Sequence, residues 1–475
     1  MNTTVFDNFI KLTKMNDLKE ENFNNQLKNS ILKAFAAFGM WSIMPVEERA
    51  NYLNKLRNVI SSNQDRIIEA ISIDTKKPVT EIICQEITAA LEMIRYIEKN
   101  YPVCLKDRKS HYRMNWLLRK TNIIRFEPIG IIAVIGPSNF PFSLIIMQSA
   151  ASIMCGNCVV VKPSEKCPHV SVIIKELITE AGFPEGVIEL ITGGKRASCE
   201  LISDVHVSKV IFTGSYQNGR DVAALCGKHF KQCILELGGS TIAVICRDAN
   251  IIKAAKCIAW STAYCNAGSC IGTRFVLADD DVFERFNIML KKELCLIKAG
   301  NSFDPETDTN NSINVELIEH SDLDEKSTGS KPALIIKRIE TIEQAIEVIN
   351  NSEFGLSVSV WSKNLKSAFE ISKRIKAGMV WINDCSTALP DFPWGGIKNS
   401  GWGRLYSKEA INELTNLKII SIDRSRSKKG KTWWYPYNKK KYNIFRAVNS
   451  LLGGKIKLAL LKELIFRSRS KKLSD

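Results

Sequence analysis

The sequence predicts an α/β fold in which a doubly wound parallel sheet forms a nucleotide-binding domain and a second α/β domain follows. Short apolar runs alternate with helical segments along the chain, which is the pattern of βαβ units in a parallel sheet. Several of these runs end in a glycine-containing turn that leads into a helix, as in nucleotide-binding folds. The length of 475 residues exceeds what one simple core accommodates and indicates two large domains.

The first domain is expected to begin with helices and to continue with βαβ units. In the first hundred residues, apolar positions recur near helical spacing between charged residues. Residues 128–161 then carry no charge, but turns at Gly136-Pro137 and Gly156-Asn157 interrupt this stretch, so a membrane span is discounted. The expected elements are a strand at Ile131–Ile135, a helix at Ser143–Met154, a strand at Cys158–Val161, a helix at 170–181, and strands at Val187–Ile191 and Lys209–Phe212.

The second α/β section is expected from near Gly238 onward. Its apolar runs are again separated by amphipathic segments of helical period. The expected strands are Thr241–Ile245, Thr273–Leu277, Pro332–Lys337, Ser357–Trp361 and Met379–Ile382, with helices at 341–350 and 364–376.

The composition is that of a soluble globular protein, with 45% apolar and 24% charged residues. The 14 cysteines show no disulfide-framework spacing, and no secretory signal is recognised, so reduced thiols in a cytoplasmic protein are expected. The pair Cys155 and Cys158 has the spacing of a dithiol centre, but small side chains that fill a tight turn are the preferred interpretation. The histidines are isolated in sequence, and no metal site is predicted.

Positive charge is concentrated at the C-terminus. Residues 424–475 contain 16 of the 66 Lys and Arg residues but only two of the 50 acidic residues, Glu463 and Asp475, so the preceding chain is nearly neutral. Apolar positions within 439–466 lie near helical spacing on both sides of Gly453-Gly454. This pattern predicts two basic amphipathic helices.

Two roles remain open for this basic tail. The helices could lie on an anionic membrane surface, with Trp433, Trp434 and Tyr435 at the interface, or they could dock on the protein's own body. The first role would make a cytoplasmic protein peripheral to the membrane. No nucleic-acid partner is predicted, because the body carries no basic face or recognition motif.

Seven short motifs occur in a fixed order along the chain. The stretch Gly214 to Gly219 alone is a poor match to a dinucleotide fingerprint and is weak evidence by itself. The evidence for a protein family therefore comes from all seven motifs and their order. The motifs are Phe-Glu-Pro-Ile-Gly (126–130), Gly-Pro-Ser-Asn-Phe-Pro (136–141), Val-Lys-Pro-Ser-Glu (161–165), Phe-Thr-Gly-Ser (212–215), Glu-Leu-Gly-Gly (236–239), Gly-Ser-Cys (268–270) and Pro-Trp-Gly-Gly-Ile-Lys-Asn-Ser-Gly-Trp-Gly-Arg (393–404).

This set, from about residue 30 to 423, resembles the aldehyde dehydrogenase superfamily. Residues 433–437, Trp-Trp-Tyr-Pro-Tyr, resemble the tail of members near the class 3 and fatty-aldehyde branch. The resemblance implies a domain order: an NAD(P)-binding domain at 1–111 and 129–237, oligomerisation arms at 112–128 and 405–423 that would pair two subunits in a homodimer, a catalytic domain at 238–404 that is shortened near 305–332, and the basic tail at 424–475.

The resemblance also implies a thiol mechanism. Cys270 matches the nucleophile, which attacks the aldehyde carbonyl as a thiolate. The amide of Asn139, with the backbone N–H of Cys270, matches the donors that hold the resulting oxyanion. Glu236 matches the general base that activates water to release the acid. The nearby Cys265 is the alternative nucleophile.

For the cofactor, NAD or NADP, the resemblance implies contacts along the edge of the first sheet. Lys162 and Glu165 match positions at the adenine ribose, and Gly214, Ser215 and Gly219 lie in the pyrophosphate turn. The positions that match the remaining pocket lining are Pro137, Ser138, Gly186 and Leu237.

The sequence departs from the family pattern at two places. The nucleophile loop reads Asn266-Ala267-Gly268-Ser269-Cys270, which is one residue short and lacks the usual glutamine. After residue 308 the chain reaches Lys331-Pro332 through a short polar stretch, and the glutamate that normally contacts the nicotinamide ribose is missing. Two functions therefore remain open: oxidation of a hydrophobic aldehyde, or a catalytically impaired relative that serves as a binding or scaffold subunit.

Overall fold

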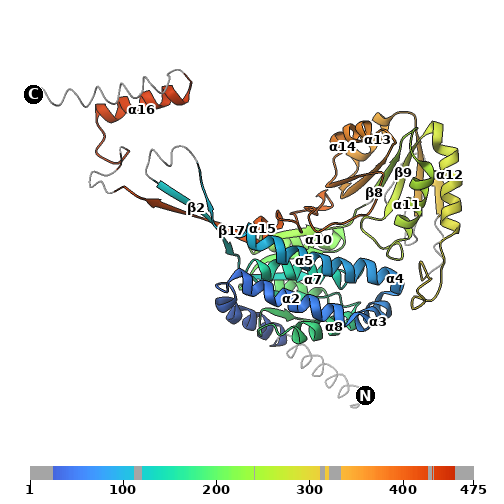
Figure 1. Cartoon of the computed structure of the whole chain (residues 1–475), viewed down its shortest axis with the longest axis horizontal. Helices are drawn as coiled ribbons and strands as arrows, with labels where there is room; N and C mark the ends of the chain where they lie inside the picture. The colour runs from blue at the N-terminus through green and yellow to red at the C-terminus, as the bar shows by residue number, and fades with distance from the viewer. Residues whose placement is uncertain are drawn as a thin grey trace, which may run out of the picture. The chain divides into compact units, whose positions relative to one another are not determined.

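The computed structural model describes residues 25–111, 120–239, 241–310, 316–319, 333–425, 431 and 433–454, the side chains of 316–319 and 333 excepted. Two compact units are present: Met1–Arg108 with Ile124–Lys418, and Lys109–Ile123 with Ile419–Asp475. The large unit contains two six-stranded sheets, each with helices packed against it (Figure 1).

The first sheet has the strand order β16-β7-β6-β3-β4-β5. Strands β3 to β7 run parallel, and β16 is antiparallel to β7. All residues of β3 and β4 are buried, which explains their uninterrupted apolar sequences. The strands are β3 (Ile131–Ile135), β4 (Cys158–Lys162), β5 (Ile188–Leu190), β6 (Val207–Thr213), β7 (Gln232–Glu236) and β16 (Gly401–Trp402).

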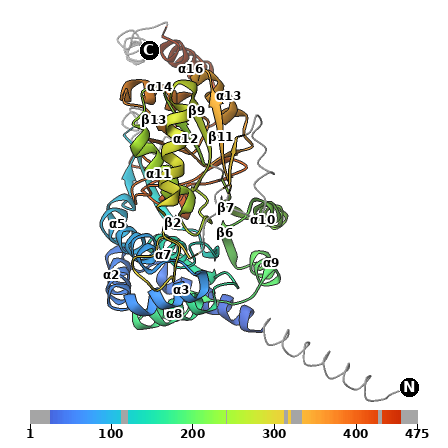
Figure 2. The same ribbon diagram turned by 90° about the vertical axis from the view of Figure 1, so that its right-hand side faces the viewer.

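The N-terminal helices pack around this sheet. α7 packs against α5 and follows directly from β3, while α9 and α10 lie beside β6 (Figure 2). The helix that includes residues 25–41 precedes the others. These others are α2 (Val46–Ser62), α3 (Gln64–Thr75), α4 (Val79–Ile82), the π-helix η1 (Ile83–Ile87), α5 (Thr88–Cys104), α7 (Ser143–Met154), α8 (Pro168–Glu180), α9 (Lys195–Ser203) and α10 (Tyr216–Lys228).

The second sheet is parallel throughout, with the order β10-β11-β9-β8-β13-β14. Alternate residues of one strand serve opposite cores: Ala243 and Ile245 pack with α11 and α12, whereas Ile242 and Val244 pack with α13 and α14. The elements are β8 (Thr241–Ile245), α11 (Ile251–Ala263), β9 (Thr273–Asp279), α12 (Asp280–Cys295), β10 (Glu316–Glu319), β11 (Ala333–Ile339), α13 (Ile342–Asn351), β13 (Ser357–Trp361), α14 (Leu365–Arg374) and β14 (Met379–Ile382).

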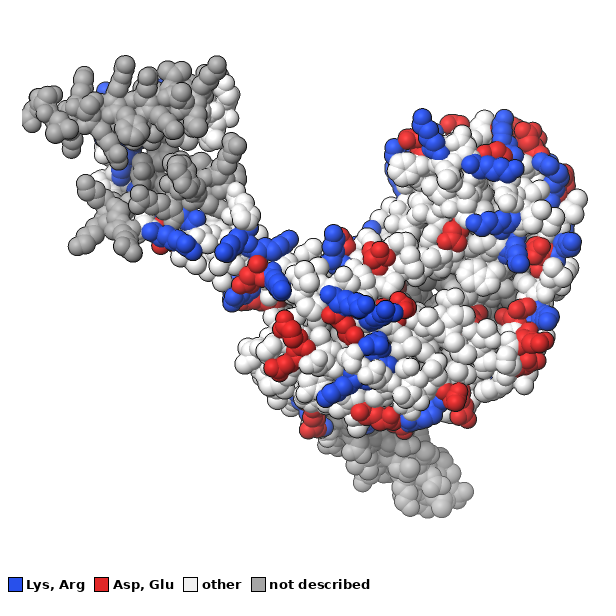
Figure 3. Space-filling view, in the orientation of Figure 1, with Lys and Arg blue, Asp and Glu red and all other residues white. Residues whose placement is uncertain are grey.

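Two smaller sheets and a last helix complete the described chain. β12 (Phe354–Gly355) pairs with β15 (Ile397–Lys398), and β1 (Arg108–Lys109), β2 (Lys120–Pro128) and β17 (Thr415–Asp423) form a three-stranded sheet. α15 (Ala410–Leu414) precedes β17, and α16 (Lys439–Leu452) lies in the tail. On the face in Figure 3, acidic and basic side chains are interspersed over the described part of the large unit, as expected from its near-neutral sequence.

The predicted fold class is confirmed. The elements β3, α7, β8, β13 and β14 have the predicted bounds, and the other predicted strands and helices that fall on described residues are found within a few residues of their expected places. Residues 311–315 and 320–332, where the shortened segment was expected, lie outside the described residues, as does 455–475, where the second tail helix was expected. Among the helices that the structure describes, none is long and apolar enough to cross a bilayer.

One prediction about the cysteines is wrong. Cys257 on α11 and Cys385, after β14, are joined by a disulfide, whereas all 14 cysteines were expected to be reduced. The remaining cysteines are free, including Cys155 and Cys158, which are buried at the turn between α7 and β4. The spacing of 128 residues between the bonded pair gives no local signal that could have revealed it.

Candidate active site

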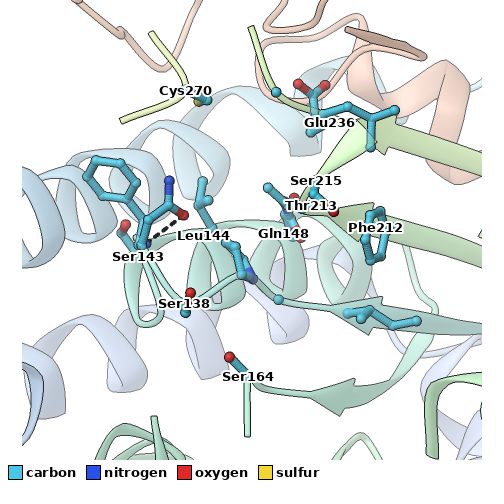
Figure 4. A pocket seen from close by; sticks show the side chains of 18 of the residues that line it. Ser138, Ser143, Leu144, Gln148, Ser164, Phe212, Thr213, Ser215, Glu236 and Cys270 are labelled. Atoms are coloured by element: carbon cyan, nitrogen blue, oxygen red, sulfur yellow. Dashed lines mark hydrogen bonds between the residues drawn. The ribbon is translucent and has the colours of Figure 1, made fainter. Parts of the chain in front are cut away.

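A cavity of about 980 Å³ lies at the carboxyl edge of the first sheet and extends to the start of the second domain. In Figure 4, Cys270 and Glu236 lie toward one side of it and Ser164 toward the other. Ten of the twelve residues predicted for the site line this cavity: Pro137, Ser138, Asn139, Lys162, Glu165, Gly214, Ser215, Glu236, Leu237 and Cys270.

Cys270 lines the cavity on the same side as Glu236 (Figure 4). Burial and the nearby charge of Glu236 raise the pKa of Cys270 to about 12. Hydrogen bonds from the backbone N–H groups of Cys270 and Ile271 lower this pKa, but by less than burial and the charge raise it. Cys265, the alternative nucleophile, does not line the cavity: its thiol donates to the backbone oxygen of Asn139 at 3.3 Å. The geometry therefore favours Cys270.

The loop before Cys270 has an unusual backbone. Cys265, Asn266 and Ala267 have φ values of 59°, 49° and 61°, a left-handed run that side-chain-bearing residues seldom adopt. The carbonyl of Ala267 accepts a hydrogen bond from the Arg274 guanidinium, and Gly268 N–H closes the turn on Cys265 O at 2.8 Å. These bonds hold the shortened loop in a tight turn.

Glu236 is the last residue of β7, and backbone hydrogen bonds to two other segments hold the end of this strand in place. Its carbonyl accepts from Gly214 N at 3.0 Å, and the next N–H, of Leu237, donates to Ser400 O at 3.0 Å. The side chain is only 6% exposed, and its Oε1 has no partner among the described residues. Burial raises the pKa of Glu236 well above its usual value, with Arg404 opposing the shift. A carboxyl group in this state is suited to accept or pass on a proton near neutral pH.

Asn139 contacts the loop that carries Cys270. Its Nδ2 donates to the backbone oxygen of Gly268 at 3.0 Å, and its Oδ1 accepts from Phe140 N at 3.0 Å. One of the two amide hydrogens is thus used by the loop that carries Cys270. The other is the one that could serve a ligand oxygen.

The helical segment from α3 to η1 supports both loops. Lys77 Nζ donates to Glu86 Oε1 at 2.7 Å and lies 3.9 Å from the centre of the Phe140 ring. The second oxygen of Glu86 accepts from Ser143 N, at the start of α7, at 2.7 Å. Glu81 Oε2 accepts from Cys265 N at 3.2 Å. This segment therefore positions the Asn139 loop and the Cys270 loop together.

The other end of the cavity has groups that suit a dinucleotide. Lys162 Nζ donates to Gly193 O at 2.8 Å and to Glu165 Oε2 at 3.3 Å, so Glu165 is held at the carboxyl edge of β4. A hydrogen bond from its own backbone N–H, and then Lys162, lower the pKa of Glu165 and keep it ionised. Ser215 caps α10 by accepting from Asn218 N at 3.3 Å, which presents a helix N-terminus of the kind that binds phosphate. These residues fit NAD(P).

Two predicted cofactor residues lie outside the cavity. Gly186 has φ +88°, and a Cβ there would lie 2.3 Å from the carbonyl oxygen of Lys33, so this glycine lets a turn pack against the first helix. A Cβ at Gly219 would lie 2.4 Å from the Leu237 side chain. Gly219 therefore supports Leu237, which does line the cavity, and makes no direct contact with the space where a cofactor would lie.

Some lining residues had no signal in the sequence. Gln148 donates to Thr213 Oγ1 at 3.0 Å while its Oε1 is buried and unpaired in the described structure. Trp394 and Tyr406 line the cavity from the C-terminal segment. Trp394 belongs to the motif 393–404. Tyr406 follows this motif and Gln148 lies in an apolar helix, so the sequence did not mark either of these two residues as part of a site. Across the described ranges, no group of three or more His, Cys, Asp and Glu side chains is arranged to hold a metal ion.

Comparisons with known proteins identify the family of this chain. The chain matches the model of the aldehyde dehydrogenase family over residues 13–322 and 331–420. It is 28% identical to the 4,4'-diapolycopene aldehyde oxidase of a Methylomonas species, over 90% of this chain and 87% of that protein. It is also 28% identical to the NADP/NAD-dependent aldehyde dehydrogenase PuuC of Escherichia coli, over 81% and 85% of the two chains.

A solved structure shares the fold. The succinic semialdehyde dehydrogenase of Streptococcus pyogenes, in complex with NADP⁺, superimposes with a TM-score of 0.78 at 25% identity, over 83% of this chain and 94% of that one. Because the family model covers most of the sequence, the chain belongs to the aldehyde dehydrogenase family, whose members oxidise aldehydes with NAD(P)⁺.

Proposed function

We propose that this protein oxidises an aldehyde to a carboxylic acid with NAD(P)⁺ through a thioester on Cys270. The observation that carries the proposal is the placement of a thiol, Cys270, and an unpaired buried carboxyl group, Glu236, in one cavity with the nucleotide-binding edge of the first sheet. The residues that would hold the dinucleotide are Lys162 and Glu165 at the ribose, and the α10 N-terminus at the pyrophosphate.

The chemistry divides into two halves. The Cys270 thiolate adds to the aldehyde carbon, and the new oxyanion is held by the free amide hydrogen of Asn139 and the backbone N–H of Cys270. When bound, NAD(P)⁺ accepts the hydride from that carbon. The resulting thioester is attacked by a water molecule whose proton passes to Glu236, and the acid leaves as the Cys270 sulfur takes up a proton.

The substrate proposed for this site is a hydrophobic aldehyde. The lining of the aldehyde end is largely apolar and includes Met93, Leu144, Leu389 and Trp394. A related protein is named 4,4'-diapolycopene aldehyde oxidase. The test is to incubate purified protein with NAD⁺ or NADP⁺ and a series of aldehydes of increasing chain length. Formation of reduced cofactor that rises with chain length and is absent in Cys270→Ala supports the proposal.

A second candidate function is a catalytically impaired subunit that binds a partner or ligand. The left-handed turn at Cys265–Ala267 and the high pKa of Cys270 favour it, since a misplacement of about 1 Å can lower the rate roughly 10²-fold. No reduced cofactor above the Cys270→Ala background, with any aldehyde, would eliminate the oxidation proposal and leave this alternative.

The oligomer proposed is a homodimer. β2 and β17, which form one sheet with β1, correspond to the segments 112–128 and 405–423 that resemble the family's pairing arms. Residues of β17 such as Leu417 and Ile419 expose apolar side chains, 54% and 73% respectively. Light scattering that finds only the mass of one chain at micromolar concentration would contradict the dimer.

The basic tail is proposed to bind an anionic membrane surface. Within its own unit α16 has no buried residue, and Trp434, Tyr435 and Tyr442 are 56%, 82% and 61% exposed beside Lys439–Lys441. Amphipathic basic helices with interfacial aromatic residues bind in this way. Co-sedimentation with anionic liposomes should be salt-sensitive, absent with zwitterionic liposomes, and lost on deletion of 424–475. No binding at low salt would instead favour docking of the tail on the protein itself.

A further inference from the structure

The disulfide connects α11 to the segment that follows β14. Cys257 on α11 is bonded to Cys385, at a sequence separation of 128 residues. The other twelve cysteines, all within the described ranges, are free. In a protein that keeps its other thiols reduced, a disulfide is usually transient, catalytic or redox-sensing.

A pair of serines connects the same two segments beside the disulfide. Ser261 lies one helical turn after Cys257 on α11, and Ser386 directly follows Cys385. The hydroxyl oxygens of the two serines are 3.0 Å apart, and both residues are buried. The covalent bond and the hydrogen bond together hold Ser386 against α11.

Ser386 has a backbone conformation that needs such support. Its φ is +56°, in the left-handed region that residues with a side chain seldom adopt. Such conformations persist where surrounding contacts fix them, and they cluster at functional sites. The disulfide at Cys385 and the hydrogen bond with Ser261 are two contacts that fix it.

Ser386 reaches the nucleophile loop through a hydrogen bond. Its hydroxyl donates to the backbone oxygen of Ile271, the residue after Cys270, at 3.0 Å. Thr241 Oγ1 donates to the same oxygen at 3.0 Å, so this peptide keeps one bond if Ser386 moves. Ser386 and Cys270 both line the cavity. A continuous series of bonds therefore joins the disulfide, through Ser386, to the peptide next to Cys270.

We propose that Ser386 is a positioning residue for the nucleophile loop, and that the Cys257–Cys385 disulfide makes its action dependent on redox state. Reduction would remove one support of Ser386, weaken its bond to Ile271 and lower turnover. The inference rests on the proposed role of Cys270 as nucleophile.

The redox step is a thiol–disulfide exchange with a dithiol or with two monothiols. A thiolate attacks one sulfur to form a mixed disulfide, and the second thiolate releases the protein thiol. The reductant gives up two electrons and two protons and becomes a disulfide, while Cys257 and Cys385 become thiols. Cys257 is half-buried and Cys385 is 1% exposed, so Cys257 is the residue that a thiol reaches first.

The experiment compares the rate of Cys270 alkylation by iodoacetamide in the oxidised and the reduced protein. The protein is prepared without reductant, or is treated with dithiothreitol that is then removed under anaerobic conditions. Peptide mass spectrometry quantifies the linked Cys257–Cys385 peptides and the alkylated Cys270 peptide. Reduction should speed alkylation of the buried Cys270 about 5-fold, the scale of one lost hydrogen bond between neutral groups. In the same samples kcat should fall while the KM for the cofactor is unchanged.

The alkylation rate needs neither cofactor nor turnover, so it reports on the redox effect even if aldehyde oxidation fails. Cys199, a free cysteine of α9 that also lines the cavity, is the internal control. Its alkylation rate should be the same in the oxidised and the reduced protein. Equal acceleration at Cys199 would mean that the whole cavity loosens, and would contradict a role confined to Ser386.

Three variants assign the effect to its residues. The double variant Cys257→Ser, Cys385→Ser should react like the reduced protein, with or without dithiothreitol. Ser386→Ala keeps the disulfide and lacks the hydroxyl, so its Cys270 should react fast already, and dithiothreitol should add less than about 2-fold. Cys295→Ser removes an exposed free thiol of α12 and should keep the full response.

Three further results would overturn the proposal. The first is the absence of linked Cys257–Cys385 peptides in protein prepared without reductant. The second is a Cys270 alkylation rate that differs by less than about 2-fold between the oxidised and the reduced protein. The third is a response to dithiothreitol that persists in the double variant or in Ser386→Ala. A response that requires both cysteines and the Ser386 hydroxyl supports the proposal.

Discussion

Lys77 and Glu86 form an ion pair at 2.7 Å, with side chains 1% and 0% exposed. The pair lies beneath the loop that carries Asn139, since Lys77 contacts the Phe140 ring and Glu86 accepts from Ser143 N. Neither residue lines the cavity, so they act on the site through the loop.

Lys77→Met should destabilise the protein and lower turnover. Removing one partner of a buried pair leaves an uncompensated charge and typically costs about 3–5 kcal/mol. A melting curve measures the loss of stability, and steady-state kinetics should show a fall in kcat larger than the change in aldehyde KM. Lys55→Met, at an exposed residue of α2, is the control. An unchanged kcat in Lys77→Met would show that the Asn139 loop does not depend on the pair.

Cys270→Ala should abolish aldehyde oxidation and leave NAD(P)⁺ binding intact, because the thiol meets the aldehyde and not the dinucleotide. Cys265→Ala should retain most activity, since the Cys265 thiol is turned toward the Asn139 carbonyl. Oxidation is measured by the absorbance of the reduced cofactor, and NAD(P)⁺ binding is measured separately by titration. The reverse pattern would identify Cys265 as the nucleophile.

Asn139→Ala should lower kcat by roughly 10²–10³-fold, the usual effect of losing one oxyanion donor. Because Asn139 Nδ2 also donates to Gly268 O, the variant also tests whether this bond positions the loop that carries Cys270. Asn139→Asp keeps the size of the side chain and removes the donor, so it should be as inactive as the alanine variant. Recovery of activity in Asn139→Asp would mean that the side chain only fills space.

The reactivity of Cys270 should rise with pH. Its pKa of about 12 leaves a small thiolate fraction near neutrality, so the fraction, and the alkylation rate, should increase about 10-fold per pH unit between pH 7 and 10. Rates measured on the Cys270 peptide check this. A plateau below pH 8 would show that the thiol is already ionised there and that the surroundings lower its pKa.

NAD⁺ and NADP⁺ should bind weakly compared with complete family members. The motif that normally supplies a glutamate to the nicotinamide ribose is missing, and the acidic residues that line the described cavity are Glu92, Glu165, Asp221 and Glu236. Of these, Glu165 and Asp221 stand at the nucleotide end, and Glu236 is at the thiol. Calorimetric titration that gives a sub-micromolar Kd would contradict the expectation and would require a substitute contact.

The elements and the site were predictable to different degrees from the sequence. β3 and α7 were found with the right bounds because a charge-free stretch divided by Gly-Pro leaves few alternatives. Cys270 and Glu236 could be singled out because each stands in a short motif of the ordered set that resembles the family. Tyr406 could not, because no motif marks it and its place in the cavity depends on hydrogen bonds that its neighbours Leu405 and Ser407 make with Trp394, Pro390 and the distant Tyr101. Gly186 lies outside the cavity, and a glycine needed for packing and one needed for a ligand look alike in one sequence.

The π-helical turn Ile83–Ile87 interrupts an otherwise continuous helical stretch from Val79 to Cys104. Such a turn accommodates one residue more than an α-helix would, which makes it equivalent to a single-residue insertion. Deleting one residue within it should restore a regular α-helix and rotate Val79–Ile82 relative to α5 by about 100°. Glu81 would then turn away from Cys265, and Glu86 could no longer face both Lys77 and Ser143. One extra residue in a helical segment that itself lines the cavity thus sets the register on which the Asn139 loop and the Cys270 loop depend.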